Sequence, residues 1–234
     1  IDAAEKILRE IKPKGIIFLG GSVANFQNGF SSISVPAVLA TLVSDELHFP
    51  NLSMVGVDDR AAAHTAVAHL IAQGHSKIAV LGGPATSFPS RMRRLGAQDA
   101  MEQAGLTFDD RLYGLSNYDF ESAYHAMNSL LARRAEFTAL FAMSDVIAFG
   151  AIRALVSAGC RVPQDVSVIG FDGITMSRYC VPVMTTIVQP SEQIALQSIE
   201  LLINQIEHGA PAQTITLQPE LQQGESVCPC RHPL

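Results

Sequence analysis

Charged and polar side chains follow several apolar runs of this sequence, at the points where predicted strands end. These side chains are Asp58, Asp59, Ser144, Asp145, Asp172 and the arginines of the basic turn at 91–94. Carboxylates accept hydrogen bonds from hydroxyl groups, and arginine donates them in a fixed fork. Such a set, gathered at one edge of a sheet, suits the binding of a polyhydroxylated ligand.

Each of these residues also has a purely structural interpretation. Asp58, Asp59 and Asp145 precede predicted helices, where a carboxylate commonly caps the first backbone N–H groups. The arginines at 91–94 can lie on a solvated first turn, but positive charge there opposes the helix dipole and calls for a compensating partner. Asp172 precedes an irregular stretch rather than a helix, so a role in the site is an open alternative for it.

Apolar runs rich in β-branched residues alternate with segments of helical periodicity along the chain. The predicted strands cover 15–20, 35–40, 53–57, 77–82, 139–143, 166–171 and 185–189. The predicted helices cover 2–11, 61–73, 91–104, 121–133, 146–158 and 191–208. Strands that are apolar on both faces and joined by helices are typical of parallel sheets covered on both sides. The fold class is therefore α/β, in which ligands bind at the carboxyl ends of the strands.

The composition excludes several classes of protein. The chain has 234 residues, of which 48% are apolar and 16% charged, and its net charge is −6. This is enough apolar material for one large core or two small ones, which excludes a disordered tail and a disulfide-stapled mini-protein. The acidic balance argues against these residues gripping nucleic acid, because that affinity rests on Lys and Arg.

The apolar runs and the cysteines bear on the compartment. No apolar run reaches the length of about 18 residues that a membrane-spanning helix needs, so no membrane partner is expected. The four cysteines are few and irregularly spaced for a chain of this size. This usage favours reduced thiols and a cytoplasmic location.

The sequence contains no recognisable enzyme signature. It has no phosphate-binding loop, no dinucleotide fingerprint, no nucleophile elbow and no H-E-x-x-H motif, so no catalytic residue and no cofactor is predicted. Cys228, Cys230 and His232 carry soft-metal ligand atoms. They have no partner pair at metal-like spacing, so no metal is predicted either.

Four segments, in order along the chain, carry a family resemblance. They are GHSKIAVLGGP (74–84), ALFAMSDVIAFGAIRAL (139–155), GCRVPQDVSVIGFDGI (159–174) and the run Thr185-Thr186-Ile187 followed by Gln189-Pro190. Together they resemble the effector-binding core of the lac repressor/gal repressor family of bacterial transcription regulators, over essentially the whole chain.

The resemblance implies a periplasmic-binding-protein-like fold. Two Rossmann-like parallel-sheet subdomains are expected, joined by three crossovers, with an effector held in the cleft. One subdomain would comprise 1–58 and 191–218, and the other 59–190 and 219–234. The family's DNA-binding helix-turn-helix and the first strands of the first subdomain are expected to precede Ile1, which leaves that subdomain incomplete.

The resemblance also implies a set of effector-binding residues. These are Ser90, Arg94, Tyr118, Ser144, Asp172 and Gln189. Arg94 and Asp172 would bracket neighbouring hydroxyls or a polar ring edge, and Tyr118 would stack on the ligand's flat face. Gln189 sits at a crossover, where its contact could couple binding to subdomain closure.

Three departures from the family pattern bear on the identity of the effector. Ala97 and Gln98 stand where a glycine and an aromatic residue are usual after the arginine. Gly173 replaces a second acidic or amide residue after the GFD motif. The basic residue usual before Ser226 and Val227 is missing.

The resemblance favours a ligand-responsive transcriptional regulator, most simply a repressor. Its expected partners are a small-molecule effector (a sugar, with a purine or other metabolite as alternatives), a DNA operator bound through the preceding segment, and a second copy in a homodimer. The alternative from another class is a periplasmic sugar-binding protein of a transporter, which shares the two-subdomain fold. A small-molecule enzyme is a third hypothesis, against which the missing signatures argue.

Overall fold

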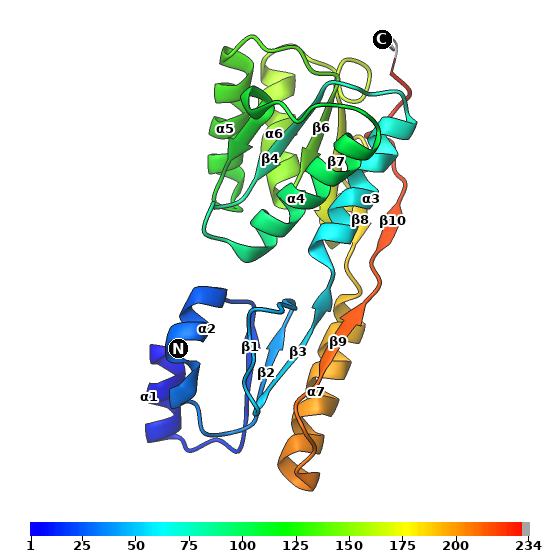
Figure 1. Ribbon diagram of the computed structural model, residues 1–234. Helices are drawn as coiled ribbons and strands as arrows, with labels where there is room; N and C mark the ends of the chain where they lie inside the picture. Colours follow the sequence, from blue (N-terminus) through cyan, green and yellow to red (C-terminus); the bar gives the residue numbers. More distant parts are fainter. Residues whose placement is uncertain (231–234) are drawn as a thin grey trace. The chain divides into compact units, whose positions relative to one another are not determined.

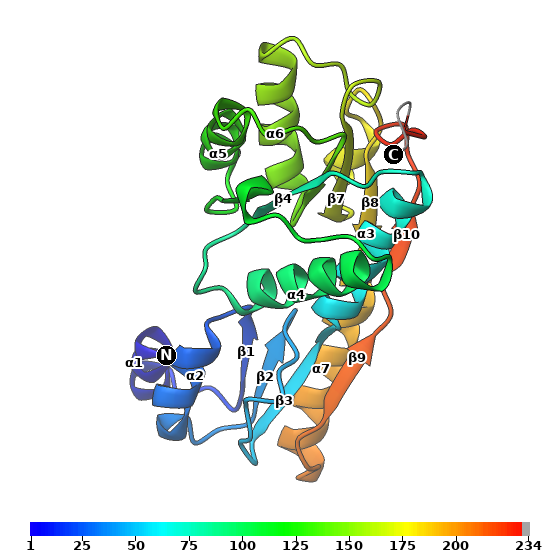
Figure 2. The same ribbon diagram turned by 45° about the horizontal axis from the view of Figure 1, so that its top comes forward.

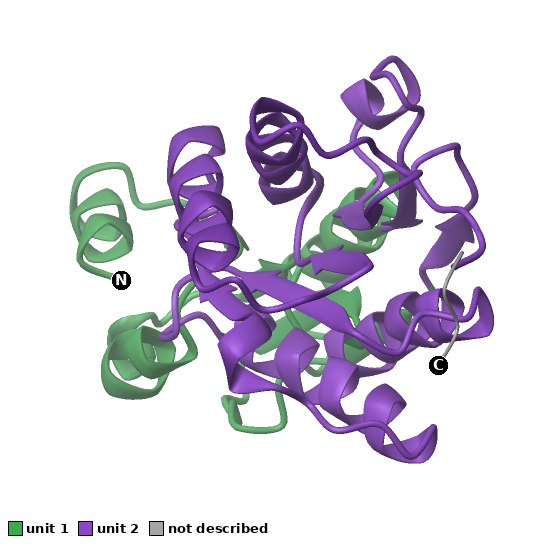
Figure 3. Ribbon diagram, turned by 90° about the horizontal axis from the view of Figure 1, so that it is seen from above, with its two compact units in different colours: residues 1–58, 190–218 green, residues 59–189, 219–234 purple. Residues whose placement is uncertain are grey.

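The chain forms two compact units, shown in green and purple in Figure 3. This computed structural model describes residues 1–230. Unit 1 comprises 1–58 and 190–218, and unit 2 comprises 59–189 and the chain from 219 onward. The chain therefore passes from one unit to the other three times. The second passage falls between Gln189 and Pro190, one residue before the boundary expected from the sequence.

Unit 1 is built on a parallel sheet of four strands (Figure 1). The strands are β1 (Ile16–Leu19), β2 (Ala37–Ala40), β3 (Leu52–Val57) and β9 (Thr214–Leu217), in the order β1-β2-β3-β9. The remaining elements are α1 (Asp2–Glu10), α2 (Val23–Gly29), η1 (Phe30–Ser32) and α7 (Ser191–His208). All three strand pairings are parallel, as the apolar runs predict.

Two apolar layers hold unit 1 together. On one face of the sheet, Ile194 and Leu201 of α7 pack with Val38 and Val55. The second layer is aromatic: the ring of Phe30 lies 4.8 Å from that of Phe49, and the rings of Phe18 and Phe26 pack beside it. Burial of such side chains is the main favourable term for a sheet covered in this way.

Unit 2 contains a sheet of six strands in the order β10-β8-β7-β6-β4-β5. These are β4 (Ile78–Gly82), β5 (Tyr113–Leu115), β6 (Ala139–Ala142), β7 (Ser167–Asp172), β8 (Thr185–Val188) and β10 (Glu220–Gln222). Only the edge strand β10 among them pairs antiparallel. The central strands β4 and β6 are buried along their whole length.

Four helices cover the two faces of this sheet (Figure 2). They are α3 (Asp59–Ala72), α4 (Phe88–Gln103), α5 (Phe120–Ala132) and α6 (Asp145–Ser157), with short helices η2 (Asp110–Leu112) and η3 (Thr175–Arg178). Helix α3 packs on α4, and α5 packs on α6. At the first contact, a Cβ on Gly96 would lie 2.0 Å from the carbonyl oxygen of Arg60, so glycine is required for the two helices to approach this closely.

Two helices begin two or three residues earlier than their periodicity predicts. Helix α4 starts at Phe88 rather than 91, because the side chain of Ser87 accepts a hydrogen bond from the Ser90 amide and the proline in the first turn is tolerated there. Helix α3 starts at Asp59 rather than 61, and Asp59 is buried there by an ion pair described below.

The elements missed from the sequence are short or lie at sheet edges. Strands β5, β9 and β10 have three or four residues and are partly exposed, so they lack the continuous apolar run of a central strand. Helix α2 has seven residues, with no charged side chain to mark a polar face. Within residues 1–230, no helix has the length and hydropathy needed to cross a membrane.

Candidate functional site

Part of the polar set predicted from strand ends meets at one edge of unit 2, whereas Asp58 belongs to unit 1. Asp172 is the last residue of β7, and Gln189 directly follows β8. Arg93 comes from the second turn of α4, and Asp59 is the first residue of α3. Parallel strands bring their carboxyl ends to the same edge of a sheet, which is why residues so far apart in the sequence form one cluster.

Arg93 is the centre of this cluster. Its Nε donates to Asp59 Oδ1 at 2.7 Å, and its Nη1 lies 3.8 Å from Asp172 Oδ1 and donates to the carbonyl of Met143. Its guanidinium carbon lies 3.6 Å from the centroid of the Phe171 ring, a cation–π contact. The side chains of Arg93 and Asp59 are only 7% and 4% exposed. Arg93 is thus held on three sides.

The charges in this cluster compensate one another. Burial alone would lower the pKa of Arg93, but Asp59 and Asp172 outweigh it and raise that pKa above its ordinary value. Burial raises the pKa of Asp172, against the opposing effects of Arg93 and Gln189. A buried arginine between two carboxylates stays charged and fixed in place.

Asp172 is the carboxylate of this group that reaches solvent, since Asp59 is buried. Its side chain is 28% exposed, and its Oδ1 accepts a hydrogen bond of 2.7 Å from Gln189 Nε2. Its backbone has a φ of +110°, a region that residues other than glycine rarely occupy. The backbone N–H of Gln189 donates to the Asp172 carbonyl at 3.0 Å. The carboxylate is therefore anchored on one side while part of it faces outward as a hydrogen-bond acceptor.

Tyr118 and Ser90, both predicted site residues, lie against each other. Ser90 Oγ is 3.0 Å from Tyr118 Oη and accepts a hydrogen bond of 2.8 Å from the Gly83 amide. Tyr118 has a φ of +61°, and its ring packs so closely on Gly83 that no Cβ fits there. Ser90 is buried, so its part is to hold the tyrosine ring and the loop after β4.

Ser144, also predicted to contact the effector, is the N-cap of α6. Its side chain accepts a hydrogen bond of 3.1 Å from the Ile147 amide, and the residue is buried. The sequence pattern predicts that Asp145 is either the N-cap of this helix or a ligand contact. Asp145 is instead the first residue of the helix and is fully buried, with its carboxylate turned to β8 and to the turn after β7.

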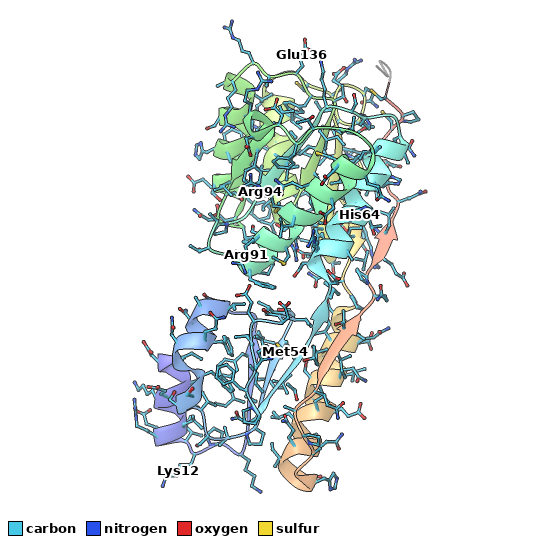
Figure 4. The ribbon with its side chains drawn as sticks, viewed as in Figure 1. Lys12, Met54, His64, Arg91, Arg94 and Glu136 are labelled. Atoms are coloured by element: carbon cyan, nitrogen blue, oxygen red, sulfur yellow. The ribbon has the colours of Figure 1, made fainter. Side chains whose placement is uncertain are left out.

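Arg94 requires a correction, because Arg93 rather than Arg94 lies beside Asp172. The Nη2 of Arg94 pairs with Asp110 Oδ1 at 2.8 Å, and its guanidinium lies 4.4 Å from the centroid of the Tyr113 ring. Figure 4 labels Arg94 on α4. Successive residues of a helix point about 100° apart, so one position decides which arginine faces the sheet.

The periodicity of α4 contains the signal that distinguishes the two arginines. Its buried residues include Arg93, Gly96, Ala97, Ala100 and Met101. This is the i, i+3, i+4, i+7, i+8 stripe of a core-facing helix, in which Arg93 takes the first place. Counting from Arg93 places Gly96 as the glycine that follows the arginine, whereas Ala97 still stands where an aromatic residue is usual.

The described residues contain no group of three His, Cys, Asp or Glu side chains arranged to hold a metal ion. His232, one member of the weak soft-metal set, lies outside the described residues. What the cluster offers is a carboxylate acceptor, an aromatic face and a fixed cation at the carboxyl edge of a parallel sheet. Such groups are of the kind that recognise small polar molecules through hydrogen bonds.

The fold defines an α/β core of the periplasmic-binding-protein type, with a polar cluster at the carboxyl edge of its larger sheet. Comparison with known proteins agrees, since residues 67–227 match the family model of the periplasmic binding protein-like domain. The chain belongs to this family.

The resemblance to lac repressor/gal repressor regulators is confirmed by the relatives. The HTH-type transcriptional regulator MalR of Clostridium butyricum is 34% identical over 221 residues, covering 94% of this chain and 66% of MalR. The HTH-type transcriptional repressor PurR of Haemophilus influenzae is 38% identical over 161 residues, covering 68% of this chain and 48% of PurR. The chain therefore spans between about half and two thirds of these relatives.

A solved structure extends the likeness to the whole chain. The complex of the transcriptional regulator CelR with cellobiose matches with a TM-score of 0.87 and 27% identity, covering 96% of this chain and 69% of CelR. The structural match thus includes both units.

Proposed function

We propose that this chain is the effector-binding part of a cytoplasmic, homodimeric transcription regulator that responds to a small sugar. The single observation that carries the proposal is the partly exposed carboxylate of Asp172 in the cluster with Arg93 and Gln189, in a chain whose relatives are transcription regulators. A carboxylate beside a fixed guanidinium accepts from one sugar hydroxyl while the guanidinium orients its neighbour. CelR, which was solved with cellobiose, supports a sugar in particular.

The place of Gln189 suggests how binding is passed on. Gln189 is the last residue of unit 2 before the chain enters unit 1, and its side chain holds Asp172. A ligand hydroxyl at Asp172 competes with this contact or reinforces it. Either change acts on the segment that connects the units. A ligand shifts the equilibrium between two conformations only when it makes different contacts in each of them.

The relatives favour a regulator over a transporter's sugar-binding protein, the alternative from another class. DNA binding decides between them. We expect the full-length protein to bind its own promoter region selectively in fluorescence anisotropy, with an affinity that changes when cellobiose, maltose or ribose is added. Sugar binding without selective DNA binding would support the alternative.

The assignment of Asp172 has its own test. We expect Asp172→Asn to weaken sugar binding about tenfold or more in calorimetry, because an amide donor replaces half of the carboxylate's acceptor capacity. Asp110→Asn changes an exposed carboxylate that pairs with Arg94 away from Asp172, and we expect it to leave the affinity unchanged. Equal affinities for both variants would refute the assignment of Asp172.

A further inference from the structure

Asp145 is a buried carboxylate that ties three separate elements together. Its Oδ1 accepts a hydrogen bond of 2.6 Å from Thr186 Oγ1 of β8, and its Oδ2 accepts one of 2.8 Å from the Ile174 amide. The Gly173 amide also donates to it. Asp145 itself begins α6 and is 0% exposed. Helix, strand and turn thus meet on one side chain.

The strand beside Asp145 leaves room for its carboxylate. A Cβ on Gly170 of β7 would lie 2.2 Å from Asp145 Oδ1. The carboxylate therefore fills the space that a side chain at 170 would need. A glycine in a strand interior costs stability and often marks a close approach of another group. In β7 that group is Asp145.

The turn that Asp145 holds is the one that begins at Asp172. Asp172 has a φ of +110° and Gly173 one of +70°, so two successive residues lie in the positive-φ region. Such a conformation is costly for an aspartate and persists only where its surroundings enforce it. The hydrogen bonds from the Gly173 and Ile174 amides to Asp145 restrain the peptide groups on the carboxyl side of Asp172.

We propose that Asp145 is a positioning residue for effector binding, which holds the turn at 172–174 so that the carboxylate of Asp172 faces the ligand. The inference rests on the proposed function only where it concerns the affinity for the ligand. Asp145 does not touch the ligand in this scheme. Its effect on affinity passes through the backbone of residues 173 and 174.

The charges around Asp145 make its action sensitive to pH. Burial raises the pKa of Asp145 to about 6, against hydrogen bonds from Thr186 and Ile174, and the charge of Asp172 raises it further. Burial raises the pKa of Cys180, and the charge of Asp145 adds to this effect. Arg93 and Asp59 act on Asp172, which in turn acts on Asp145. Protonated Asp145 has one oxygen fewer to accept with, so the turn is held less tightly at low pH.

Hydrogen–deuterium exchange in the intact, ligand-free protein tests the restraint directly. Asp145→Ala is expected to speed the exchange of the amides at 173 and 174. The matched control is Thr186→Val, which removes a buried hydrogen bond from the same carboxylate but leaves both amides their acceptor. Equal protection of these amides in both variants would overturn the proposal.

Calorimetry with the tightest-binding sugar among cellobiose, maltose and ribose tests the consequence for binding. Asp145→Ala is expected to lose about tenfold or more in affinity, and Thr186→Val less than about twofold. Asp145→Asn keeps one oxygen to accept from Ile174, so its affinity should lie between those of the alanine variant and the unmodified protein. An equal loss in the alanine and asparagine variants would show that the carboxylate acts otherwise than through the turn.

A pH series covers the case in which Asp145→Ala does not fold. The affinity of the unmodified protein is expected to rise with pH through about 6, the pKa of Asp145, and that rise should be absent in Asp145→Asn. A rise of the same size in both proteins would overturn the proposal. If none of the three sugars binds, the sugar assignment fails, and the exchange experiment still decides the role of Asp145.

Discussion

Arg93 and Arg94 are neighbours in the sequence with opposite environments. Arg93 is 7% exposed and lies between two carboxylates, whereas Arg94 is 36% exposed and pairs with Asp110, which is 80% exposed. Desolvated ions depend on their partners far more than solvated ions do, because water no longer compensates for a lost contact. The contributions of the two arginines to the free energy of unfolding should therefore differ severalfold.

Replacement of each arginine by methionine tests this difference. Arg93→Met is expected to lower the free energy of unfolding by about 3–5 kcal/mol, because it leaves Asp59 buried without a counter-charge. Arg94→Met should cost under about 1 kcal/mol, the usual range for an exposed pair. Urea unfolding followed by circular dichroism measures both. Similar losses for the two variants would contradict the assignment of Arg93 to the buried network.

Asp145 gives the folded protein a pH-dependent stability. Its pKa is raised from 3.8 to about 6, so the folded state binds a proton more tightly than the unfolded state does. The resulting stabilisation is fully present below pH 3.8 and is lost as pH rises through about 6. A difference of this size corresponds to about 3 kcal/mol.

Denaturant unfolding between pH 4 and 7 checks this linkage. The fall in unfolding free energy with rising pH is expected to be smaller in Asp145→Asn, by about 3 kcal/mol. Thr186→Val removes a hydrogen bond that lowers the pKa of Asp145. In this variant the unfolding free energy should therefore continue to fall up to a higher pH. If the asparagine variant keeps the full pH dependence, other groups are responsible for it.

At the scale of elements, the contact between α3 and α4 is what brings Asp59 to Arg93. Asp59 begins α3, and Arg93 lies one helical turn before Gly96, where a Cβ would meet the backbone of α3. Interhelical distances are set by the side chains at the contact. A larger residue at 96 would therefore separate the helices that carry the ion pair.

Gly96→Ala is expected to destabilise the protein, although a change from glycine to alanine usually stabilises a helix. In an open helix this change stabilises by about 1 kcal/mol, because alanine is the better helix former. In α4 the added Cβ would lie 2.0 Å from the Arg60 carbonyl oxygen, and we expect a loss of about 1–3 kcal/mol instead. Glu102→Ala, at an exposed position of the same helix, controls for propensity. Thermal unfolding of both variants decides whether the helices are in contact at Gly96.

The elements show where sequence periodicity is sufficient and where it fails. The apolar runs predict the buried strands β4, β6 and β7 directly, since both faces of these strands are covered. Edge strands β9 and β10 were missed because half-exposed residues give no such run. The start of α3 was misplaced because a buried ion pair outweighs the polarity of Asp59.

At the scale of the whole molecule, sugar binding and DNA binding, the two kinds of binding that we propose, place different demands on charge. The net charge of −6 is spread over a chain with only 16% charged residues. A sugar is held by a few local hydrogen bonds, whereas DNA affinity rises with the number of cations that neutralise phosphates. The composition of residues 1–234 suits the first task.

A protein consisting of residues 1–234 is therefore expected to bind no operator DNA. Fluorescence anisotropy over about 50–200 mM salt should show no saturable binding by this chain, whereas the full-length regulator that we propose is expected to bind operator DNA with an affinity that falls steeply with salt. Sugar binding by the full-length protein, which involves no charged polymer, should hardly change over the same range. Salt-sensitive DNA binding by residues 1–234 alone would contradict this division of roles.

Patterns in the sequence alone establish the fold class, the strands of the buried cores and the edge at which polar residues gather. Each of these depends on local periodicity and on the rule that parallel strands end at one edge. Two contacts emerge only in the folded chain: Arg93 lies beside Asp172, and Asp145 holds the turn at 172–174. These depend on the rotation of α4 about its axis and on contacts between residues far apart in the chain. Packing settles such contacts, because a buried charge must find its partner wherever the fold brings one.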